Sequence, residues 1–505
     1  MTRPSLWIDG RRPATAALAE RLSVDVAVIG AGITGLTAAV QLARAGCRVA
    51  VLENRRLASG ATGFTTAKIS LLQGARYRQL QRDHGPAVTE GYAAANTDAA
   101  DWIRQRVRSD GVNCGHEHRT ALTWAHDRTS MAQLEEEVEA AQAAGVDARL
   151  VTETDLPFPV AGGVQLADQA QFDPVAYLNG LAGLAEAAGA MLHEHTRVKA
   201  VQTASRSGPL RVLTDTLEVS ADHVLVCTGV PFMDRGLFFA RMEPVRSYLI
   251  AVPAPRGAPR SMSISVDEPV RSLRTTPGAD GEELLLVGGS SHTVGRRADT
   301  EGAYQALEDW TAEVLGVAEV RATWSTQDYV PQDGLPYVGS TWSLPDRVRV
   351  ATGFAKWGMT NGTAAGCLLA ADVLGRPPAW AEVFAAGRLG PARKLGRVIK
   401  LNAEVGGRLV KDQFVRPGPR PEPAEGQGEV VREGLHLTAV SRSEGATCAV
   451  SAICPHLGGV LSWNPAERSW DCPLHGSRFD ARGALLQGPA VDDLALRPPE
   501  PPDAG

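Results

Sequence analysis

The chain has 505 residues, of which 44% are hydrophobic and 21% charged, and this mixture excludes a largely disordered chain. The net charge of -6 argues against a nucleic-acid-binding protein, which usually carries a basic excess. The most apolar stretch, residues 26–40, is too short to cross a bilayer, so no integral membrane segment is expected. Seven scattered cysteines do not indicate a disulfide framework, and we expect a cytoplasmic location.

The first pattern in chain order is a β-α-β unit over residues 23–53. An apolar run at residues 24–29 predicts a strand, and residues 33–45 form a helical pattern that stops before Gly46, a residue suited to a helix C-terminus. Residues 48–53 predict a second buried strand. Strand, helix and strand in this order predict an α/β fold with a parallel sheet.

A glycine motif, Gly30-x-Gly32-x-x-Gly35, joins the first strand to the helix. The first glycine permits the tight turn, the second lets the backbone approach a pyrophosphate, and the third lets helix and strand pack closely. The pyrophosphate would lie at the positive helix N-terminus. Glu53 ends the second strand and can accept hydrogen bonds from a ribose diol. This predicts a dinucleotide site, and the motif alone fits FAD as well as NAD.

Helices and short strands are expected after the βαβ unit. Residues 76–145 and 175–190 are typical of helices, and short strands are expected between residues 197 and 227. Residues 241–330 hold short strands separated by Pro/Gly turns, which indicates an antiparallel sheet. Residues 347–375 return to strand, Gly-rich turn and helix.

The last part of the chain begins after a change in composition. Residues 388–420 hold many Lys and Arg, and a Pro-rich piece follows at 417–423. We interpret this region as a linker, with the basic run on a solvated helix and connector. Residues 426–505 are rich in short strands and turns and predict a separate all-β module.

Beyond the glycine motif, three segments resemble the flavin-dependent amine and amino-acid oxidase family, the D-amino-acid/glycine oxidase-like group. Residues 224–229 (Val-Leu-Val-Cys-Thr-Gly) resemble its later strand and turn, residues 333–339 its D-G-x-P-x-I-G segment, and residues 353–359 the loop and helix start that cap the flavin. Residues 59–70 lie where the family's chain passes the ribityl and flavin. The resemblance covers about residues 23–380 and implies FAD as the cofactor. The residues implied to bind it are Gly30, Gly32, Gly35, Glu53, Thr65, Thr66, Lys68, Thr228, Gly229, Gly353, Gly358 and Met359.

The last module carries a second ligand pattern. Cys454-x-His456 is followed by Cys472-x-x-His475, and the module resembles a Rieske [2Fe–2S] domain closely. In such a domain two thiolates hold one iron and two imidazoles hold the other. A zinc ion is the alternative, because Cys2His2 sets also bind zinc. The Pro-His-Leu-Gly and His-Gly-Ser-x-Phe contexts favour the Rieske cluster.

Departures from the high-potential respiratory Rieske type bear on the cluster's potential. Gly459 and Leu474 stand where that type has two extra cysteines, and Phe479 stands where it has a tyrosine hydroxyl aimed at a cysteine sulfur. Ser477 keeps its hydroxyl. Because losing a hydrogen bond to sulfur lowers the potential, we expect a lower-potential centre of the ferredoxin or oxygenase type.

The two resemblances together imply a fold class: an α/β FAD-binding domain of the Rossmann-like, glutathione-reductase type, a substrate domain built on an antiparallel sheet, and a C-terminal all-β Rieske domain. The expected boundaries are 1–75, 155–240 and 333–380 for the FAD-binding parts, 76–154 and 241–332 for the substrate domain, 381–425 for the linker and 426–505 for the Rieske domain.

The expected function is oxidation of a C–N or C–OH bond of a small molecule by hydride transfer to FAD. The electrons would pass singly to the cluster and on to an external acceptor. The family's carboxylate-clamping arginine is replaced by Asp328, and a second arginine by Lys356, which favours an amine over an ordinary amino acid. Asp328, Lys356 and Trp357 are therefore the candidate catalytic residues, and Arg246, Tyr248 and Tyr329 are candidate pocket residues.

An alternative function is an electron-transfer reductase that feeds a partner oxygenase. That function usually needs a second nucleotide-binding fold, and no second G-x-G-x-x-G follows a strand. A Rieske oxygenase would need a further domain with a mononuclear iron triad, and a non-catalytic redox sensor would not need the substrate-type sheet. The sequence leaves open the substrate, the external donor or acceptor protein and the direction of electron flow.

Overall fold

A computed structural model describes residues 3–203, 208–233, 236–341, 346–388, 390 and 417–498. Its first sheet (sheet A) has the strand order β16-β17-β10-β1-β2-β7, with the hairpin of β8 and β9 attached to β10. β1, β2, β7, β10 and β17 are parallel, so both faces of the sheet need cover. The bounds are β1 (Leu22–Ile29), β2 (Val49–Leu52), β7 (Met191–His193), β8 (Val198–Thr203), β9 (Leu210–Thr214), β10 (Glu218–Val226), β16 (Tyr337–Gly339) and β17 (Val348–Thr352).

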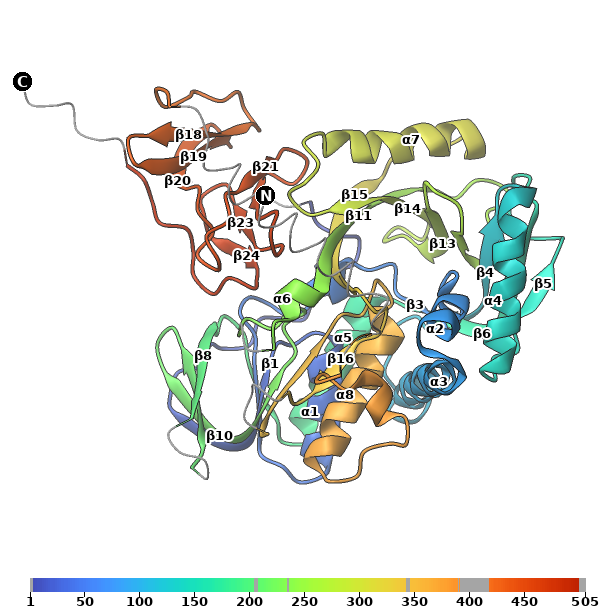
Figure 1. Cartoon of the computed structure of the whole chain (residues 1–505), viewed down its shortest axis with the longest axis horizontal. Coiled ribbons are helices and arrows are strands. Elements are labelled where there is room, and N and C mark those ends of the chain that lie inside the picture. The colour runs from blue at the N-terminus through green and yellow to red at the C-terminus, as the bar shows by residue number, and fades with distance from the viewer. Residues whose placement is uncertain are drawn as a thin grey trace, which may run out of the picture.

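Helices α1 (Ile33–Arg44), α5 (Pro174–Ala187) and α8 (Gly358–Val373) pack together beside this sheet (Figure 1). α5 begins where the side chain of Asp173 accepts hydrogen bonds from two backbone N–H groups, and Pro174 fills the first helical position. The βαβ unit expected over residues 23–53 is present as β1, α1 and β2.

The second sheet (sheet B) is the large, mostly antiparallel sheet of the substrate domain. Its strand order is β15-β11-β14-β13-β12-β4-β6-β3, and β5 pairs with β6. The bounds are β3 (Lys68–Ile69), β4 (Glu117–Ala125), β5 (Arg149–Val151), β6 (Gly162–Gln171), β11 (Met242–Pro253), β12 (Met262–Ser265), β13 (Arg271–Pro277), β14 (Glu283–Thr293) and β15 (Ala322–Pro331). β15 is an edge strand and pairs with β11.

The strand β6 corrects one expected boundary. We expected residues 155–240 to belong to the FAD-binding part, but β6 pairs with β4 over most of its length and therefore lies in sheet B. The reason is long-range pairing, since the neighbouring strands that decide the sheet are distant in sequence. Helices α4 (Met131–Ala143) and α7 (Glu301–Leu315) pack on this sheet. Helix α2 (Arg76–His84) packs against α4, and α3 (Pro86–Ser109) packs against α2 and α8.

The C-terminal module is all-β, as expected. One sheet holds β18 (Gly428–Glu433), β19 (His436–Ser443) and β20 (Ala446–Ser451), and another holds β21 (Ser462–Asn464), β22 (Ser469–Asp471), β23 (Arg478–Asp480) and β24 (Leu485–Gln487). It has its own hydrophobic core, which includes Trp470 and Phe479. In Figure 1 the module lies beside α7, β15 and α6 (Phe238–Arg241).

Most of the expected linker, residues 381–425, lies outside the described residues. The described portion of the chain includes no helix with both the length and the apolar character that crossing a bilayer requires.

Candidate functional site

A cavity of about 410 Å³ lies where sheet A, sheet B and the C-terminal module meet. Most residues expected to bind FAD line this cavity. They are Gly30, Gly32, Glu53, Thr65, Thr66, Lys68, Thr228, Gly229, Gly358 and Met359. Gly35 and Gly353 do not line it. The three candidate catalytic residues, Asp328, Lys356 and Trp357, also border the cavity.

The glycines of the first motif provide the close approach that a bound dinucleotide needs. Gly30 has φ +100°, and a Cβ there would lie 2.7 Å from the carbonyl oxygen of Cys227. A Cβ on Gly35 would lie 2.0 Å from the carbonyl oxygen of Gly30, so helix α1 could not pack so closely with a larger residue. Gly32 borders the cavity directly, one residue before α1 begins. The turn therefore fits a pyrophosphate against the N-terminus of α1.

Glu53 follows β2 and is held from two sides. Its Oε2 accepts a hydrogen bond from the Ala31 N–H (2.9 Å), and its Oε1 accepts one from the Arg55 N–H (3.0 Å). Burial raises the pKa of this carboxyl, and the two N–H groups oppose that change. The fixed carboxylate has acceptor capacity left for a ribose diol on the cavity side.

The loop after β2 contributes Thr65, Thr66 and Lys68 along a second side of the cavity. The Thr66 carbonyl accepts a hydrogen bond from the buried guanidinium of Arg274. The ammonium of Lys68 donates to the Ser263 carbonyl and the Ser272 hydroxyl, each at 2.7 Å. Burial, aided by the charge of Arg274, lowers the pKa of Lys68 to about 7.

The loop before α8 has an unusual backbone. Gly353, Ala355 and Lys356 have φ values of +78°, +52° and +71°, in the left-handed region that is unfavourable for the latter two. A Cβ on Gly353 would lie 2.6 Å from the Pro331 ring, so this glycine allows the loop to pass β15. The loop thus places Lys356, Trp357 and the first residues of α8 along the cavity.

Asp328 and Lys356 come together at the cavity. The Asp328 carboxylate accepts hydrogen bonds from the backbone N–H groups of Tyr329 (2.7 Å) and Lys356. Burial raises the pKa of Asp328 to about 6. The Lys356 ammonium donates a hydrogen bond to the Ser291 hydroxyl (2.8 Å). Burial lowers the pKa of Lys356, and the negative charge of Asp328 opposes this change. A carboxyl group with a pKa of about 6 can take up a proton near neutral pH.

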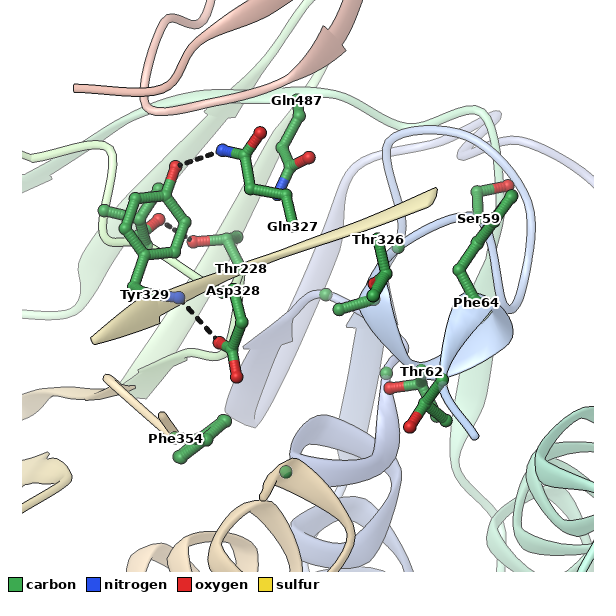
Figure 2. A pocket seen from close by; sticks show the side chains of 18 of the residues that line it. Ser59, Thr62, Phe64, Thr228, Thr326, Gln327, Asp328, Tyr329, Phe354 and Gln487 are labelled. Carbon is green, nitrogen blue, oxygen red and sulfur yellow. Dashed lines mark hydrogen bonds between the residues drawn. The ribbon is translucent and has the colours of Figure 1, made fainter. Parts of the chain in front are cut away.

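Figure 2 shows how strand β15 divides its side chains between two faces. Thr326 and Asp328 point to one side, while Gln327 and Tyr329 point to the other, as the two-residue period of a strand requires. The expected pocket residue Tyr248 lies on β11, and its ring packs against Tyr304 of α7 with centroids 4.8 Å apart. The Tyr248 ring therefore packs toward α7, and the residue also borders the cavity, as expected.

Arg246, another expected pocket residue, is also buried against the other modules. It is 1% exposed, and its charge interacts with Glu467 and Asp471 of the C-terminal module. All three expected pocket residues border the cavity: Arg246, Tyr248 and Tyr329. Gln327 borders it too, because the cavity extends around the edge strand β15.

The two cysteine–histidine loops have the same backbone design. The Gly458 N–H donates to the Cys454 carbonyl, and the Gly476 N–H donates to the Cys472 carbonyl, both at 3.1 Å. The two glycines have φ values of +75° and +79°. Each loop therefore presents one cysteine and one histidine in the same manner.

The four ligand side chains converge between these loops. The thiols of Cys454 and Cys472 are buried and lie within hydrogen-bonding distance. The rings of His456 and His475 have centroids 5.1 Å apart. Among the residues that the structure describes, no three His, Cys, Asp or Glu side chains surround a point as ligands of a single ion would. In a Rieske cluster each iron takes only two protein ligands, so the donor set fits that cluster.

Gly459 and Leu474, at the positions of the respiratory type's two extra cysteines, pack against each other. A Cβ on Gly459 would lie 2.6 Å from Leu474 Cδ1 and 3.1 Å from Cys472 Sγ. Leu474 therefore covers the ligand loops where a cross-link would lie. The Ser477 hydroxyl hydrogen-bonds to Cys454, while Phe479 is buried and brings no hydroxyl.

The histidine loop docks directly on the remainder of the protein. Gln327 Nε2 donates to the Gly476 carbonyl (2.8 Å), and the Tyr329 hydroxyl lies 3.3 Å from the His475 carbonyl. The ring of Phe239, on α6, lies against both ligand rings, with centroids 4.7 Å from His475 and 5.8 Å from His456. The candidate cluster therefore faces the cavity-bearing part of the chain.

Sequence reasoning missed several residues of this site. Thr62 accepts a hydrogen bond from the Ile33 N–H at the start of α1 (3.3 Å) and borders the cavity. Phe239 and Gln327 were also missed, as were residues 485–491, which line the cavity from the C-terminal module. Thr62 lies within the loop expected near the flavin, so it could have been included. The others are brought in by contacts more than 100 residues distant in sequence, which no local pattern signals.

Two family models match the chain. The model of FAD dependent oxidoreductases (DAO) matches residues 25–371, and the Rieske [2Fe-2S] domain model matches residues 421–498. YhfW of Bacillus subtilis (strain 168), which bears the name of a Rieske 2Fe-2S iron-sulfur protein, is 32% identical over 488 residues, covering 95% of each chain. The cytochrome b6-f complex iron-sulfur subunit 1 of Nostoc is 51% identical over 47 residues, only 26% of its length.

Solved structures resemble the part of the chain before the C-terminal module. Glycine oxidase from Geobacillus kaustophilus superimposes with a TM-score of 0.58 and 22% identity, covering 73% of this chain and 99% of that one. L-proline dehydrogenase from P. horikoshii gives 0.57 and 19% identity, covering 73% and 98%. At these identities the likeness establishes the fold.

Proposed function

The chain belongs to the FAD-dependent oxidoreductase (DAO) family and ends in a Rieske [2Fe–2S] domain, and from this premise we propose that it oxidises a C–N or C–OH bond of a small molecule. FAD supplies a two-electron acceptor for the substrate hydride, and the Rieske cluster supplies a one-electron carrier. In this proposal the electrons leave singly through the cluster to an external acceptor.

The observation that carries the proposal is the position of β15 between the two candidate centres. Asp328 borders the cavity that holds the glycine motif, while Gln327 and Tyr329 bind the carbonyls of the histidine loop. Residues adjacent in one strand thus contact both sites. This supports electron transfer inside one chain.

The charges in the cavity support an amine rather than an amino-acid carboxylate as the recognised group. Asp328 is hydrogen-bonded by two backbone N–H groups and would repel a substrate carboxylate. It can instead accept a hydrogen bond from an amine, and with a pKa of about 6 it can take up a proton from one. Lys356, held by Ser291, would orient a polar group on the same side. Trp357 would supply an apolar wall.

The names of structural neighbours agree with C–N oxidation. Glycine oxidase, L-proline dehydrogenase and L-amino acid deaminase share the fold of the first 380 or so residues. Because Asp328 replaces the arginine expected to bind a carboxylate, we place the substrate of this chain among amines that lack an adjacent carboxylate.

A screen of flavin reduction tests the proposal. The purified protein is mixed anaerobically with amines, amino acids or alcohols, flavin absorbance is followed, and the cluster is then examined by EPR. We expect an amine to bleach the flavin and to produce the signal of the reduced cluster. Bleaching by NADPH, with none by any member of the panel, would instead favour a reductase that feeds a partner oxygenase. Flavin reduction with a cluster that never changes oxidation state would contradict the electron route.

A further inference from the structure

The Rieske domain contributes one wall of the cavity that holds the FAD-binding motifs. Residues Leu485, Leu486, Gln487, Gly488, Ala490 and Val491 line it; we call residues 485–491 the C-terminal wall. Leu485–Gln487 form strand β24, and the others follow it directly. These residues lie more than 100 positions after the end of the DAO match at residue 371, so they are additional to that family's fold.

The same cavity includes most of the expected dinucleotide-binding residues. Gly30, Glu53, Arg197 and Thr228 border the same cavity, and Glu53 is the expected ribose ligand. Figure 2 shows Gln487 on the same side of β15 as Gln327, with Thr228 nearby. The C-terminal wall therefore stands over the region that a bound dinucleotide would occupy.

Ion pairs join Asp492 and Asp493, which directly follow the C-terminal wall, to the FAD-binding part. Arg197 Nη1 binds Asp493 Oδ1 at 2.9 Å, while its Nε donates to the Asn54 side chain (3.1 Å), next to the expected ribose ligand. Lys199 Nζ binds Asp492 Oδ1 at 2.6 Å. The two acidic residues follow the wall immediately in sequence.

Hydrogen bonds connect the same wall to the cluster loops. The Ala490 N–H donates to the Ser477 hydroxyl oxygen (3.0 Å), and that hydroxyl bonds to the cluster ligand Cys454. The Tyr329 hydroxyl lies 3.1 Å from the Gly488 carbonyl and also contacts the His475 carbonyl. The residues just after the C-terminal wall thus bind the FAD-binding part, while Ala490, within the wall, binds a cluster loop.

We propose that the C-terminal wall of the Rieske domain is part of the FAD site and retains the cofactor, so that FAD binding and docking of the Rieske domain stabilise each other. FAD would then be released mainly from molecules in which the domain has moved away. By linkage, bound FAD strengthens the docking by the same factor by which docking strengthens FAD binding.

A steric variant at the contact between the substrate domain and the Rieske domain tests the proposal. Gly295 has φ +67°, and a Cβ there would lie 2.8 Å from the Pro473 backbone of a cluster loop. Gly281 has φ +83° and open space around its Cβ position, so Gly281→Ala is the matched control for backbone strain. We expect Gly295→Ala to release FAD about three- to tenfold faster than wild type, measured as free-flavin fluorescence after dilution, and Gly281→Ala to match wild type.

A charge variant tests the same point without a steric change. Asp492→Asn with Asp493→Asn removes the ion pairs but keeps side-chain oxygen acceptors, including the one for the Leu485 N–H (2.9 Å). The control is Glu282→Gln with Glu319→Gln, which removes two carboxylates from exposed Arg321. We expect faster FAD release, roughly two- to fivefold, in the first pair alone. If Gly295→Ala does not fold, the FAD release rates of these two double variants test the proposal by themselves.

Hydrogen exchange in the full chain supplies the reciprocal measurement. Removal of FAD should accelerate amide exchange in residues 485–491, and the Gly295→Ala variant should do the same with FAD bound. If exchange at the wall accelerates while FAD release stays at the wild-type rate, the wall does not retain the cofactor and the proposal is wrong. Equal acceleration of release in both glycine variants would also overturn it. No substrate is present in these assays, so the result is independent of the proposed reaction.

Discussion

At the glycine turn, close backbone contacts limit the size of side chain that a single position can accept. Gly35 does not touch the cavity, yet a Cβ there would lie 2.0 Å from the Gly30 carbonyl oxygen. Its function is to let α1 pack against the turn, as the sequence motif predicts.

Gly35→Ala should therefore cost stability and cofactor together. Because the clash is with backbone, we expect the free energy of unfolding to fall by about 1–3 kcal/mol and FAD content to decrease. Thermal unfolding and the flavin-to-protein absorbance ratio measure both. Gly183→Ala, in helix α5 with open space around its Cβ position, is the control and should leave stability equal or slightly higher.

Asp328 is the residue on which the proposed chemistry depends most. Asp328→Asn keeps an oxygen acceptor for one of the two backbone N–H groups and removes the base, so we expect anaerobic flavin reduction to slow by about 10²–10⁴-fold with FAD content unchanged. Since burial raises the pKa of Asp328 to about 6, the wild-type rate should fall as the pH decreases through 6, because protonation removes the base. A wild-type rate that does not change between pH 5 and about 7 would contradict this role.

Ser477 is the residue that tunes the cluster most directly. Its hydroxyl bonds to the Cys454 sulfur, and such a bond favours the reduced, more negative cluster. Ser477→Ala should lower the midpoint potential by roughly 40–60 mV, the equivalent of one hydrogen bond for a one-electron couple. EPR-monitored redox titration checks this value. An unchanged or higher potential would show that the hydroxyl does not act on the cluster.

At the scale of elements, β15 is the strand that connects the two sites. Asp328, on one face, borders the cavity, while Gln327 and Tyr329, on the other face, bind the Rieske domain and border the cavity as well. The period of two in a strand assigns Asp328 to one function and its neighbours to the other.

The contacts of Tyr329 make this connection testable. Tyr329→Phe removes the hydroxyl that contacts the His475 and Gly488 carbonyls. We expect electron transfer from flavin to cluster to slow about five- to tenfold, while flavin reduction by substrate is unchanged. Stopped-flow absorbance with rapid-freeze EPR separates the two steps. Tyr304→Phe is the control, because Tyr304 binds Glu467 of the same domain at a different contact (2.8 Å) and should leave the transfer rate unaltered.

At the scale of the whole molecule, the two redox modules share one chain and one interface. Phe239 of α6 and Gln327 and Tyr329 of β15 hold the histidine loop against the remainder of the protein. Cluster reduction after flavin reduction should therefore follow first-order kinetics, with a rate constant that does not change over a tenfold range of protein concentration. Stopped-flow measurements at several concentrations check this, and a rate that rises in proportion to concentration would mean transfer between molecules.

Most of the local chemistry could be predicted from sequence, because it lies in short continuous segments. The glycine turn with Glu53 and the two cysteine–histidine loops each occupy a few dozen residues or fewer, and spacing alone specifies their geometry. The βαβ unit, the antiparallel sheet and the all-β module were predicted for the same reason. The boundary at residue 155 was wrong, because the partners of β6 are set by long-range pairing.

From the sequence alone, the motifs and the family resemblance predicted FAD and a [2Fe–2S] cluster, and the two family models confirm these cofactors. The residues expected to hold them stay predictions, and most of those expected at FAD line one cavity. The arrangement of the two sites became visible only in the folded chain: β15 contacts both of them, the ring of Tyr248 packs against Tyr304, and residues of the C-terminal module border the cavity. The physical reason is that docking depends on surfaces contributed by residues such as Tyr329 and His475, 146 positions apart. A local pattern encodes periodicity and ligand spacing, but it carries no information about which distant surface will cover it.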